Sequence, residues 1–147
     1  MGATVRQILQ AKGSFIWSIS PHATVYEALQ LMADKDIGAV VVVEDEKLVG
    51  IFSERDYARR GILKGRNSKE TKVSEVMTQD VFFVRLDQTI EECMVLMTNK
   101  HIRHLPVIET GKLAGMVTVG DVVKAVIADQ EVMIKSLENY IRGDYGR

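Results

Sequence analysis

The sequence predicts an α+β protein built from two copies of one β-α-β-β-α unit. Two observations support this fold class. The chain matches itself without a gap over about forty positions when it is shifted by 65 residues, so that Thr24 falls on Thr89 and Asp56 on Asp121. Each copy also passes from strand-like to helical to strand-like patterning in the same order. A shared order of elements in two aligned copies predicts a tandem repeat.

Each copy is expected to open with a short strand, over 16–20 in the first copy and 81–85 in the second. A helix follows, because a threonine precedes a glutamate by three residues, which is the pattern of a capping box. The pairs are Thr24 with Glu27 and Thr89 with Glu92. Apolar residues then recur on one helical face in both copies.

A hairpin is predicted after this helix in each copy. The first copy has strands over 39–43 and 48–52, and the second has strands over 105–108 and 113–117. Residues 39–43 are a continuous apolar run rich in β-branched side chains, which is typical of a strand covered on both faces. Polar residues between the two strands of each copy indicate the turn.

The repeat divides the chain into four parts. They are a first repeat with its N-terminal lead-in (1–63), a linker (64–72), a second repeat (73–128) and a C-terminal helical extension (129–147). The last helix carries an apolar stripe from Asp121 to Ile141, well beyond the point where its counterpart ends at Gly61. This stripe either packs on its own domain or forms the seam of a homo-oligomer.

Composition excludes several classes of protein. The chain has 147 residues and a formal net charge of −1, so it has no basic surplus for nucleic acid or an anionic membrane. No apolar run approaches the roughly 18 residues of a membrane span. A single cysteine, Cys93, forms no internal disulfide and is expected as a small buried residue of the helical stripe. We therefore expect a cytoplasmic protein that binds neither nucleic acid nor membrane.

One motif occurs once per copy, as Gly-x-x-[Ser/Thr]-x-x-Asp. It reads Gly50-Ile51-Phe52-Ser53-Glu54-Arg55-Asp56 and Gly115-Met116-Val117-Thr118-Val119-Gly120-Asp121. The hydroxyl stands where a strand ends and a helix begins, and free N–H groups at a helix N-terminus favour phosphate. An Asp one turn later can accept hydrogen bonds from two ribose hydroxyls. The same spacing is also that of an ordinary capping box.

A second cluster, Arg103-His104-Leu105-Pro106-Val107, leads into a strand of the second copy. The planar guanidinium of Arg103 suits a phosphate group, and His104 lies beside it in the sequence. His101 and His104 could instead hold a metal ion, but no third ligand has a matching spacing, so no metal site is expected.

The duplicated unit, the Gly-Ile-Phe-Ser-Glu-Arg-Asp segment and the Arg-His-Leu-Pro-Val segment together resemble CBS domains paired as a Bateman module. The resemblance covers about residues 4–128. It implies two repeats packed sheet to sheet with pseudo-twofold symmetry, two clefts for adenosine-containing ligands, and a disc-like homodimer.

The resemblance also implies which residues line the clefts. Cleft one would comprise Ile51, Ser53, Arg55, Asp56, Phe82, Phe83, Arg103, His104 and Pro106. Cleft two would comprise Trp17, Ser18, Gly38, Ala39, Met116, Thr118 and Asp121. The positions that match Arg103 and His104 in cleft two are Gly38 and Ala39, so its phosphate side is expected to lack charge.

The expected function is therefore non-catalytic: regulatory binding of AMP, with ADP, ATP or NAD(H) as variants, that acts on a separate effector protein. A ligand that contacts both copies could shift their relative arrangement if it binds one arrangement better. The alternative is a protein interaction module with vestigial clefts, in which the long last helix recruits a partner. No acid–base pair, activated nucleophile or metal site of an enzyme is apparent in the sequence.

Overall fold

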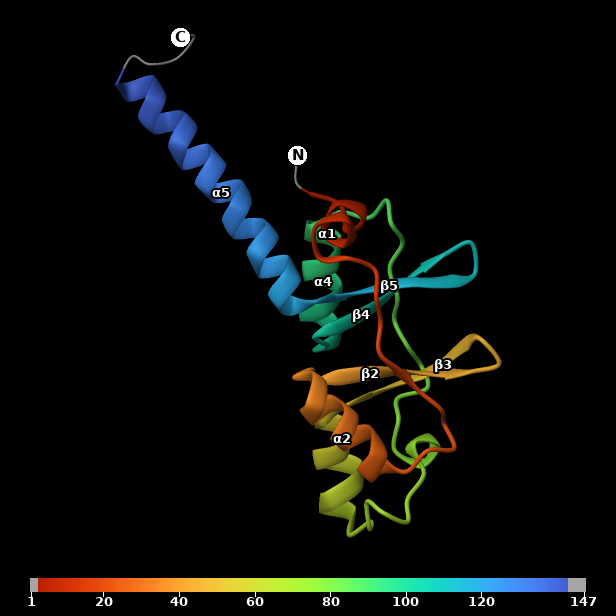
Figure 1. Ribbon diagram of the computed structural model, residues 1–147. Coiled ribbons are helices and arrows are strands. Elements are labelled where there is room, and N and C mark those ends of the chain that lie inside the picture. Colours follow the sequence, from red (N-terminus) through yellow and green to blue (C-terminus); the bar gives the residue numbers. More distant parts are fainter. Residues whose placement is uncertain (1–2, 143–147) are drawn as a thin grey trace. The chain divides into compact units, whose positions relative to one another are not determined.

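The computed structural model describes residues 3–142, which form two compact units (Figure 1). The first-repeat unit comprises residues 15–83 and 110–113. The second-repeat unit comprises residues 84–109, those from 114 onward, and the N-terminal residues up to 14. Each unit combines helices with a small sheet, which confirms the predicted α+β class.

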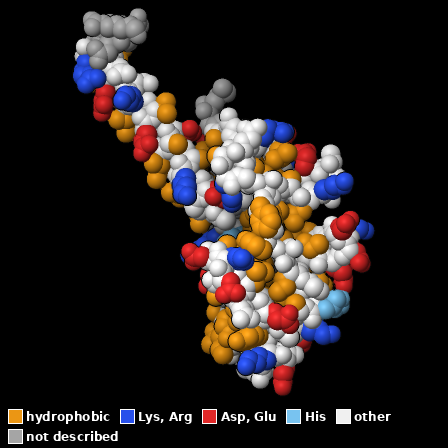
Figure 2. Space-filling model, in the orientation of Figure 1, with side chains coloured by type: hydrophobic (Ala, Val, Ile, Leu, Met, Phe, Trp, Pro, Cys, Tyr) orange, Lys and Arg blue, Asp and Glu red, His pale blue; other side chains and the backbone are white. Residues whose placement is uncertain are grey.

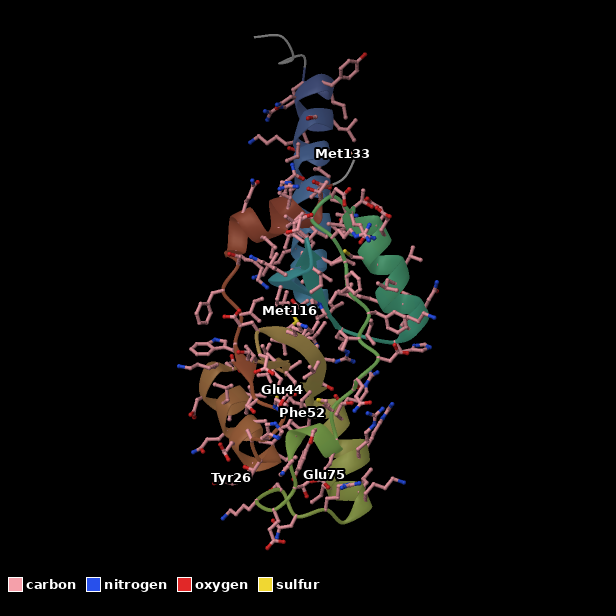
Figure 3. The ribbon with its side chains drawn as sticks, turned by 90° about the vertical axis from the view of Figure 1, so that its right-hand side faces the viewer. Tyr26, Glu44, Phe52, Glu75, Met116 and Met133 are labelled. Carbon is pink, nitrogen blue, oxygen red and sulfur yellow. The ribbon has the colours of Figure 1, made fainter. Side chains whose placement is uncertain are left out.

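The first-repeat unit contains a three-stranded sheet in the order β1-β2-β3. Strand β1 (Ser18–Ile19) pairs in parallel with β2 (Ala39–Glu44), and β2 pairs antiparallel with β3 (Lys47–Ser53). Helix α2 (Val25–Lys35) begins at the capping box of Thr24, as predicted. The core lies between this helix and the sheet and includes Phe52, labelled in Figure 3, which is fully buried.

The end of the first repeat differs from the single regular helix expected up to Gly61. One helical turn, α3 (Glu54–Asp56), passes into a π-helical turn, η1 (Tyr57–Gly61), and then into a 3-10 turn, η2 (Ile62–Lys64). The side chain of Arg60 donates a hydrogen bond to the carbonyl oxygen of Met77 at 3.0 Å. This contact fixes the π-helical turn against the segment that enters the second repeat.

The second-repeat unit has the same element order in a reduced form. Helix α4 (Ile90–Lys100) begins at the capping box of Thr89, and β4 (His104–Glu109) forms a hairpin with β5 (Lys112–Thr118). The strand predicted over 81–85 is only a single parallel bridge, between Val84 and Val107. Helix α5 (Val119–Ile141) then extends from this unit, and the described part of the chain contains no helix that could cross a membrane.

Each repeat begins with a short helical segment, its lead-in, and this segment packs on the other repeat. Helix α1 (Val5–Lys12) belongs to the second-repeat unit, where the backbone N–H of Val5 donates to the carbonyl of Gln88 at 2.8 Å. The corresponding 3-10 turn η3 (Val73–Glu75) belongs to the first-repeat unit, with its Val73 N–H on the carbonyl of Ala23 at 2.8 Å. The division of the sequence at 63 and 73 stays a prediction, and the compact units are assembled across it.

The same exchange explains why Gly50 is required in β3. A Cβ atom at Gly50 would lie 2.6 Å from Sδ of Met77 and 2.9 Å from the carbonyl oxygen of Thr78. The backbone of Thr78 is held there by two hydrogen bonds with Ile51, at 2.9 and 2.8 Å. There is no room for a side chain while this pairing persists.

We expect Gly50→Ala to lower the free energy of unfolding by about 1–3 kcal/mol, because the added methyl group overpacks the contact with Thr78. Urea unfolding followed by circular dichroism measures the change. Gly120→Ala is the matched control, since its Cβ would meet only Oγ1 of Thr118 at 3.6 Å. That variant should be unchanged or more stable by up to about 1 kcal/mol. Equal losses in both variants would contradict this account of Gly50.

Candidate functional site

The two Gly-x-x-[Ser/Thr]-x-x-Asp segments occupy equivalent places in the two units. Ser53 ends β3 and is the N-cap of α3, and Thr118 ends β5 and is the N-cap of α5. In both, the hydroxyl oxygen accepts a hydrogen bond from the backbone N–H of the Asp three residues later, at 3.2 Å. The structure therefore confirms the position predicted for the two hydroxyls.

In the first-repeat unit the carboxylate of Asp56 is held on both oxygens. Its Oδ2 accepts from the backbone N–H of Ser53 at 2.9 Å and from the Ser53 hydroxyl at 3.0 Å. Its Oδ1 accepts from the hydroxyl of Thr78 at 3.0 Å. Asp56 is only 8% exposed. An ionised carboxylate can accept about four hydrogen bonds, so the three that Asp56 already accepts fix it in place and leave capacity for about one more.

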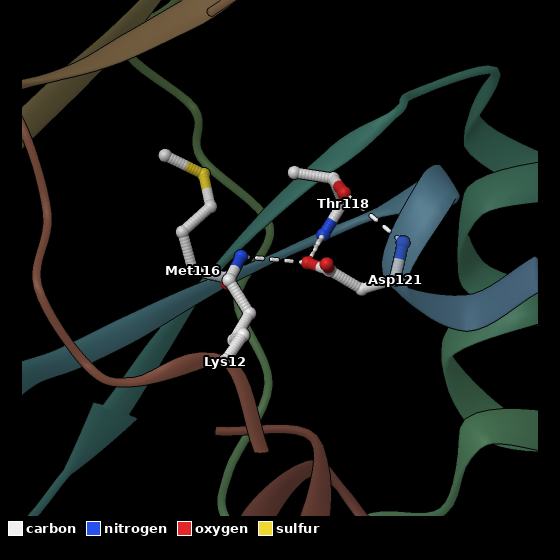
Figure 4. Close-up of polar contacts among 4 residues, drawn as sticks. All are labelled: Lys12, Met116, Thr118 and Asp121. Atoms are coloured by element: carbon white, nitrogen blue, oxygen red, sulfur yellow. Dashed lines mark hydrogen bonds and ion pairs between the residues drawn. The ribbon is translucent and has the colours of Figure 1, made fainter. Parts of the chain in front are cut away.

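In the second-repeat unit the equivalent Asp121 is paired with a cation (Figure 4). Nζ of Lys12 lies 2.7 Å from Oδ2 of Asp121 and also donates to the carbonyl oxygen of Met116 at 3.0 Å. Oδ2 accepts a further hydrogen bond from the backbone N–H of Thr118 at 2.9 Å. The two repeats therefore present the same carboxylate with different partners, a threonine hydroxyl in one and an ammonium group in the other.

The electrostatics of the second-repeat unit reflect this ion pair. Burial raises the pKa of Asp121, but the hydrogen bond and charge of Lys12, with the hydrogen bonds of Thr118, outweigh it and hold the pKa below its usual value. Burial lowers the pKa of His104, and the charges of Arg103 and Lys12 lower it further, against the opposing effect of Asp121. At neutral pH, His104 is therefore an uncharged imidazole.

Aromatic and backbone groups of the first-repeat unit lie near the ends of its strands. Trp17 packs edge to face on Phe15 with ring centroids 4.8 Å apart, and Nζ of Lys35 lies 4.4 Å from its ring centroid. The carbonyl of Gly38 accepts a hydrogen bond from the N–H of Glu54 at 3.0 Å. The remaining predicted residues of this unit are Ser18, Ala39, Ile51, Arg55, Phe82 and Phe83, of which both phenylalanines are exposed.

Backbone contacts fix the remaining predicted residues of the second-repeat unit. The carbonyl of Arg103 accepts from the N–H of Val119 at 2.9 Å, at the first turn of α5. The carbonyl of Pro106 accepts from the N–H of Val84 at 3.0 Å. The structure thus gathers Arg103 and His104 with Asp121 in one unit, and Ser53 with Asp56 in the other. The pairing of Asp56 with Arg103 in one cleft stays a prediction.

Two functional candidates are absent from the sequence-based set, Lys12 and Thr78. Both belong to the lead-ins, and Lys12 is 109 positions away from Asp121. The lead-ins do repeat in the sequence, with Val5 to Leu9 resembling Val73 to Met77, and this was the available signal. It did not show that each lead-in would reach the Asp of the repeat on which it packs.

Cys93 is not part of either site. It is fully buried in the core of the second-repeat unit, and burial raises the pKa of its thiol to about 11. A thiol that stays protonated at neutral pH is a poor nucleophile. Its place in the core agrees with the expected small buried residue.

The Lys12–Asp121 pair makes stability depend on acid pH. The pKa of Asp121 is lowered on folding, so its contribution is present above the unfolded value near 3.8 and is lost as pH falls through the folded value. We expect Lys12→Met to reduce the unfolding free energy at pH 7 by about 1 kcal/mol. The difference from the parent protein should shrink below about pH 4, as urea unfolding at several pH values will show. The exposed Lys64 gives the control: a pH-dependent loss of the same size in Lys64→Met would argue against the ion pair.

Comparison with known proteins agrees with the repeat. The family model described as the CBS domain matches residues 14–62 and 73–128. The mitochondrial CBS domain-containing protein CBSX3 of Arabidopsis thaliana is 39% identical over 152 aligned residues, which cover 97% of this chain and 73% of that protein.

Solved structures show the same fold. A protein with CBS domains from Burkholderia ambifaria matches with a TM-score of 0.84 and 49% identity, over 87% of this chain and 96% of its own. A CBS domain pair in complex with 5′-methylthioadenosine and S-adenosyl-L-methionine matches with a TM-score of 0.77 over 88% of this chain and 99% of its own. At 21% identity this second likeness shows the fold alone. With two family matches and a close relative along nearly its whole length, the chain belongs to the CBS domain family and carries a pair of CBS repeats.

Proposed function

We propose that this chain is a regulatory module that binds an adenine nucleotide through residues of both CBS repeats and acts on a separate effector protein. CBS pairs are generally regulatory modules rather than enzymes, and the family model that matches this chain is that of the CBS domain. AMP is the favoured ligand, with ADP, ATP and NAD(H) as variants. The proposed setting is cytoplasmic, and the proposed assembly is a homodimer.

One observation carries the proposal: both repeats place a hydroxyl and a carboxylate at the same strand-to-helix junction. In each, hydrogen bonds fix the carboxylate in place and leave it able to accept a hydrogen bond from a ribose hydroxyl. A capping box needs only the N-cap residue and the acidic residue three positions later. It does not require a further polar side chain that contacts the carboxylate. Thr78 and Lys12 supply that further side chain.

The phosphate is assigned to Arg103. Its planar guanidinium can form paired hydrogen bonds with phosphate oxygens. His104 beside it has a lowered pKa, so it takes part as a neutral hydrogen-bonding group rather than as a second cation. In cleft two, where Gly38 and Ala39 occupy the matching positions, we propose that Lys12 is the cation instead.

The proposal that the ligand contains adenosine is supported by the ligands of another CBS pair, not by a contact in this chain. A CBS pair of the same fold binds 5′-methylthioadenosine and S-adenosyl-L-methionine, two ligands that share adenosine and differ in their tails. Exposed aromatic rings at Trp17, Phe82 and Phe83 offer apolar surface for a base in this chain. The tail of the ligand would then be selected by Arg103 and Lys12.

The ribose assignment can be tested first by changing the ligand, which leaves the capping box of Ser53 and Asp56 intact. We expect AMP to bind more tightly than 2′,3′-dideoxyadenosine monophosphate by about 1–3 kcal/mol, because the dideoxy nucleotide leaves the carboxylate of Asp56 without the diol. Isothermal titration calorimetry gives both affinities. In Asp56→Ala the two nucleotides should bind equally, with circular dichroism checking that the variant is folded. Equal binding of both nucleotides to the unaltered chain would remove the ribose role.

The phosphate assignment predicts a different pattern. Arg103→Ala should weaken AMP by about 1.5–3 kcal/mol and leave adenosine within about 0.5 kcal/mol, because only the nucleotide carries the charge. Arg59→Ala, a change of the same kind at an exposed position of the first-repeat unit, should alter neither. Equal losses for AMP and adenosine would contradict a phosphate contact. No binding of AMP at millimolar concentration would favour the alternative of an interaction module.

A further inference from the structure

Helix α5 leaves the core of its unit and continues with an uncovered apolar face. Val122 is fully buried and Val126 is partly buried against the core, whereas almost every residue from 127 to 141 is exposed. Figure 1 shows this part of α5 extending beyond α1 and α4 of the same unit. Figure 2 shows hydrophobic side chains along it, and Met133 is labelled there in Figure 3.

The exposed apolar side chains follow a helical seam. Val123, Ile127, Ile134, Leu137 and Ile141 recur at alternating intervals of about 3.5 residues, with Gln130 at the one remaining seam position. They are between 47% and 82% exposed. A seam of this period is the pattern by which one helix packs along another, so the face is built for a helical occupant.

The charges of α5 disfavour a membrane surface as that occupant. The helix carries two lysines, Lys124 and Lys135, against four acidic residues, which are Asp121, Asp129, Glu131 and Glu138. Amphipathic helices that lie on anionic bilayers carry a surplus of Lys and Arg on the polar face, which this helix lacks. The occupant is therefore a protein helix with a mixed-charge flank.

We propose that the occupant is α5 of a second copy of this chain, aligned antiparallel. The two flanks of the seam differ: one carries Lys124, Glu131, Lys135 and Glu138, and the other carries Val126, Met133 and Tyr140. In an antiparallel pair related by a twofold axis, each flank meets the same flank of its copy. A parallel pair would set the charged flank against the apolar one, which leaves charges beside apolar side chains.

The antiparallel alignment centred on residue 132 matches both the seam and the charges. Ile134 then lies opposite Gln130 of the second copy, and Ile127 opposite its Leu137. On the charged flank, Lys124 comes near the second copy's Glu138, and Glu131 comes near both Glu131 and Lys135 of that copy. Opposite charges flanking a seam set the orientation of paired helices.

The exposed surface is large enough for a stable pair. At about 25 cal/mol per Å², a fully buried aliphatic side chain corresponds to about 60–120 Å² of surface removed from water. The seven large apolar residues that are exposed on the seam and its apolar flank, which are Val123, Ile127, Met133, Ile134, Leu137, Tyr140 and Ile141, therefore supply roughly 400–800 Å² per copy. A standard interface buries about 800 Å² on each partner.

Sedimentation equilibrium of the full chain tests the pairing. We expect a dimer for the parent protein and at least a tenfold weaker dimer for Ile134→Glu and for Leu137→Glu. Val132→Glu is the matched control, because Val132 is 68% exposed on the opposite side of α5. It should stay dimeric. A monomeric parent, a dimer unaffected by both seam variants, or an equal loss in Val132→Glu would overturn the proposal.

Disulfide trapping tests the direction. Under oxidising conditions the double variant Gln130→Cys/Ile134→Cys should form covalent dimers, because the two positions face each other across an antiparallel seam. The single variants Gln130→Cys and Ile134→Cys should form few. The native Cys93 is buried, so the parent protein is the background control. Efficient linkage of the single variants would show a parallel pair and refute the proposed alignment. Nucleotide is absent from both experiments, so their outcome is separate from that of the proposed nucleotide binding, although it also tests the proposed homodimer.

Discussion

The hydrogen-bonded junction between a strand and a helix is the interaction on which the rest of this structure depends. At Ser53 and Thr118 the strand ends and the hydroxyl accepts an N–H of the following helix, while the Asp three residues later accepts the N–H of the hydroxyl-bearing residue. This reciprocal pair satisfies N–H groups that would otherwise lack a partner at the helix start. It also fixes a carboxylate at the carboxyl end of a strand, where the proposed ligand contacts are made.

The two junctions have the same capping hydrogen bonds, but their carboxylates have different further partners. Asp56 receives the hydroxyl of Thr78, and Asp121 receives the ammonium group of Lys12. Both partners come from lead-ins that pack on the other repeat of the sequence, and the different side chains that the two lead-ins supply make the two junctions unequal. A duplicated sequence therefore yields two junctions whose charges differ, and in the proposed function a nucleotide would meet a neutral donor at one and a cation at the other.

The second repeat also differs from the first at its end. The first repeat finishes in short α, π and 3-10 turns that close on its own core through Arg60 and Met77. In the second repeat the same junction starts a helix of 23 residues, of which only the first two turns pack on the core. A capping box sets where a helix begins, but its length follows from the residues beyond, and here an amphipathic pattern continues it.

The sequence by itself determined the repeat, the capping boxes at Thr24 and Thr89, the hairpins and the two strand-to-helix junctions. These features depend on patterns a few residues long and on direct comparison of the two copies. Tertiary structure alone decided that 81–85 is a single bridge at Val84, that the turn after Asp56 is π-helical, and that Lys12 reaches Asp121. Each of these depends on contacts between segments far apart in the chain, which local propensity does not predict.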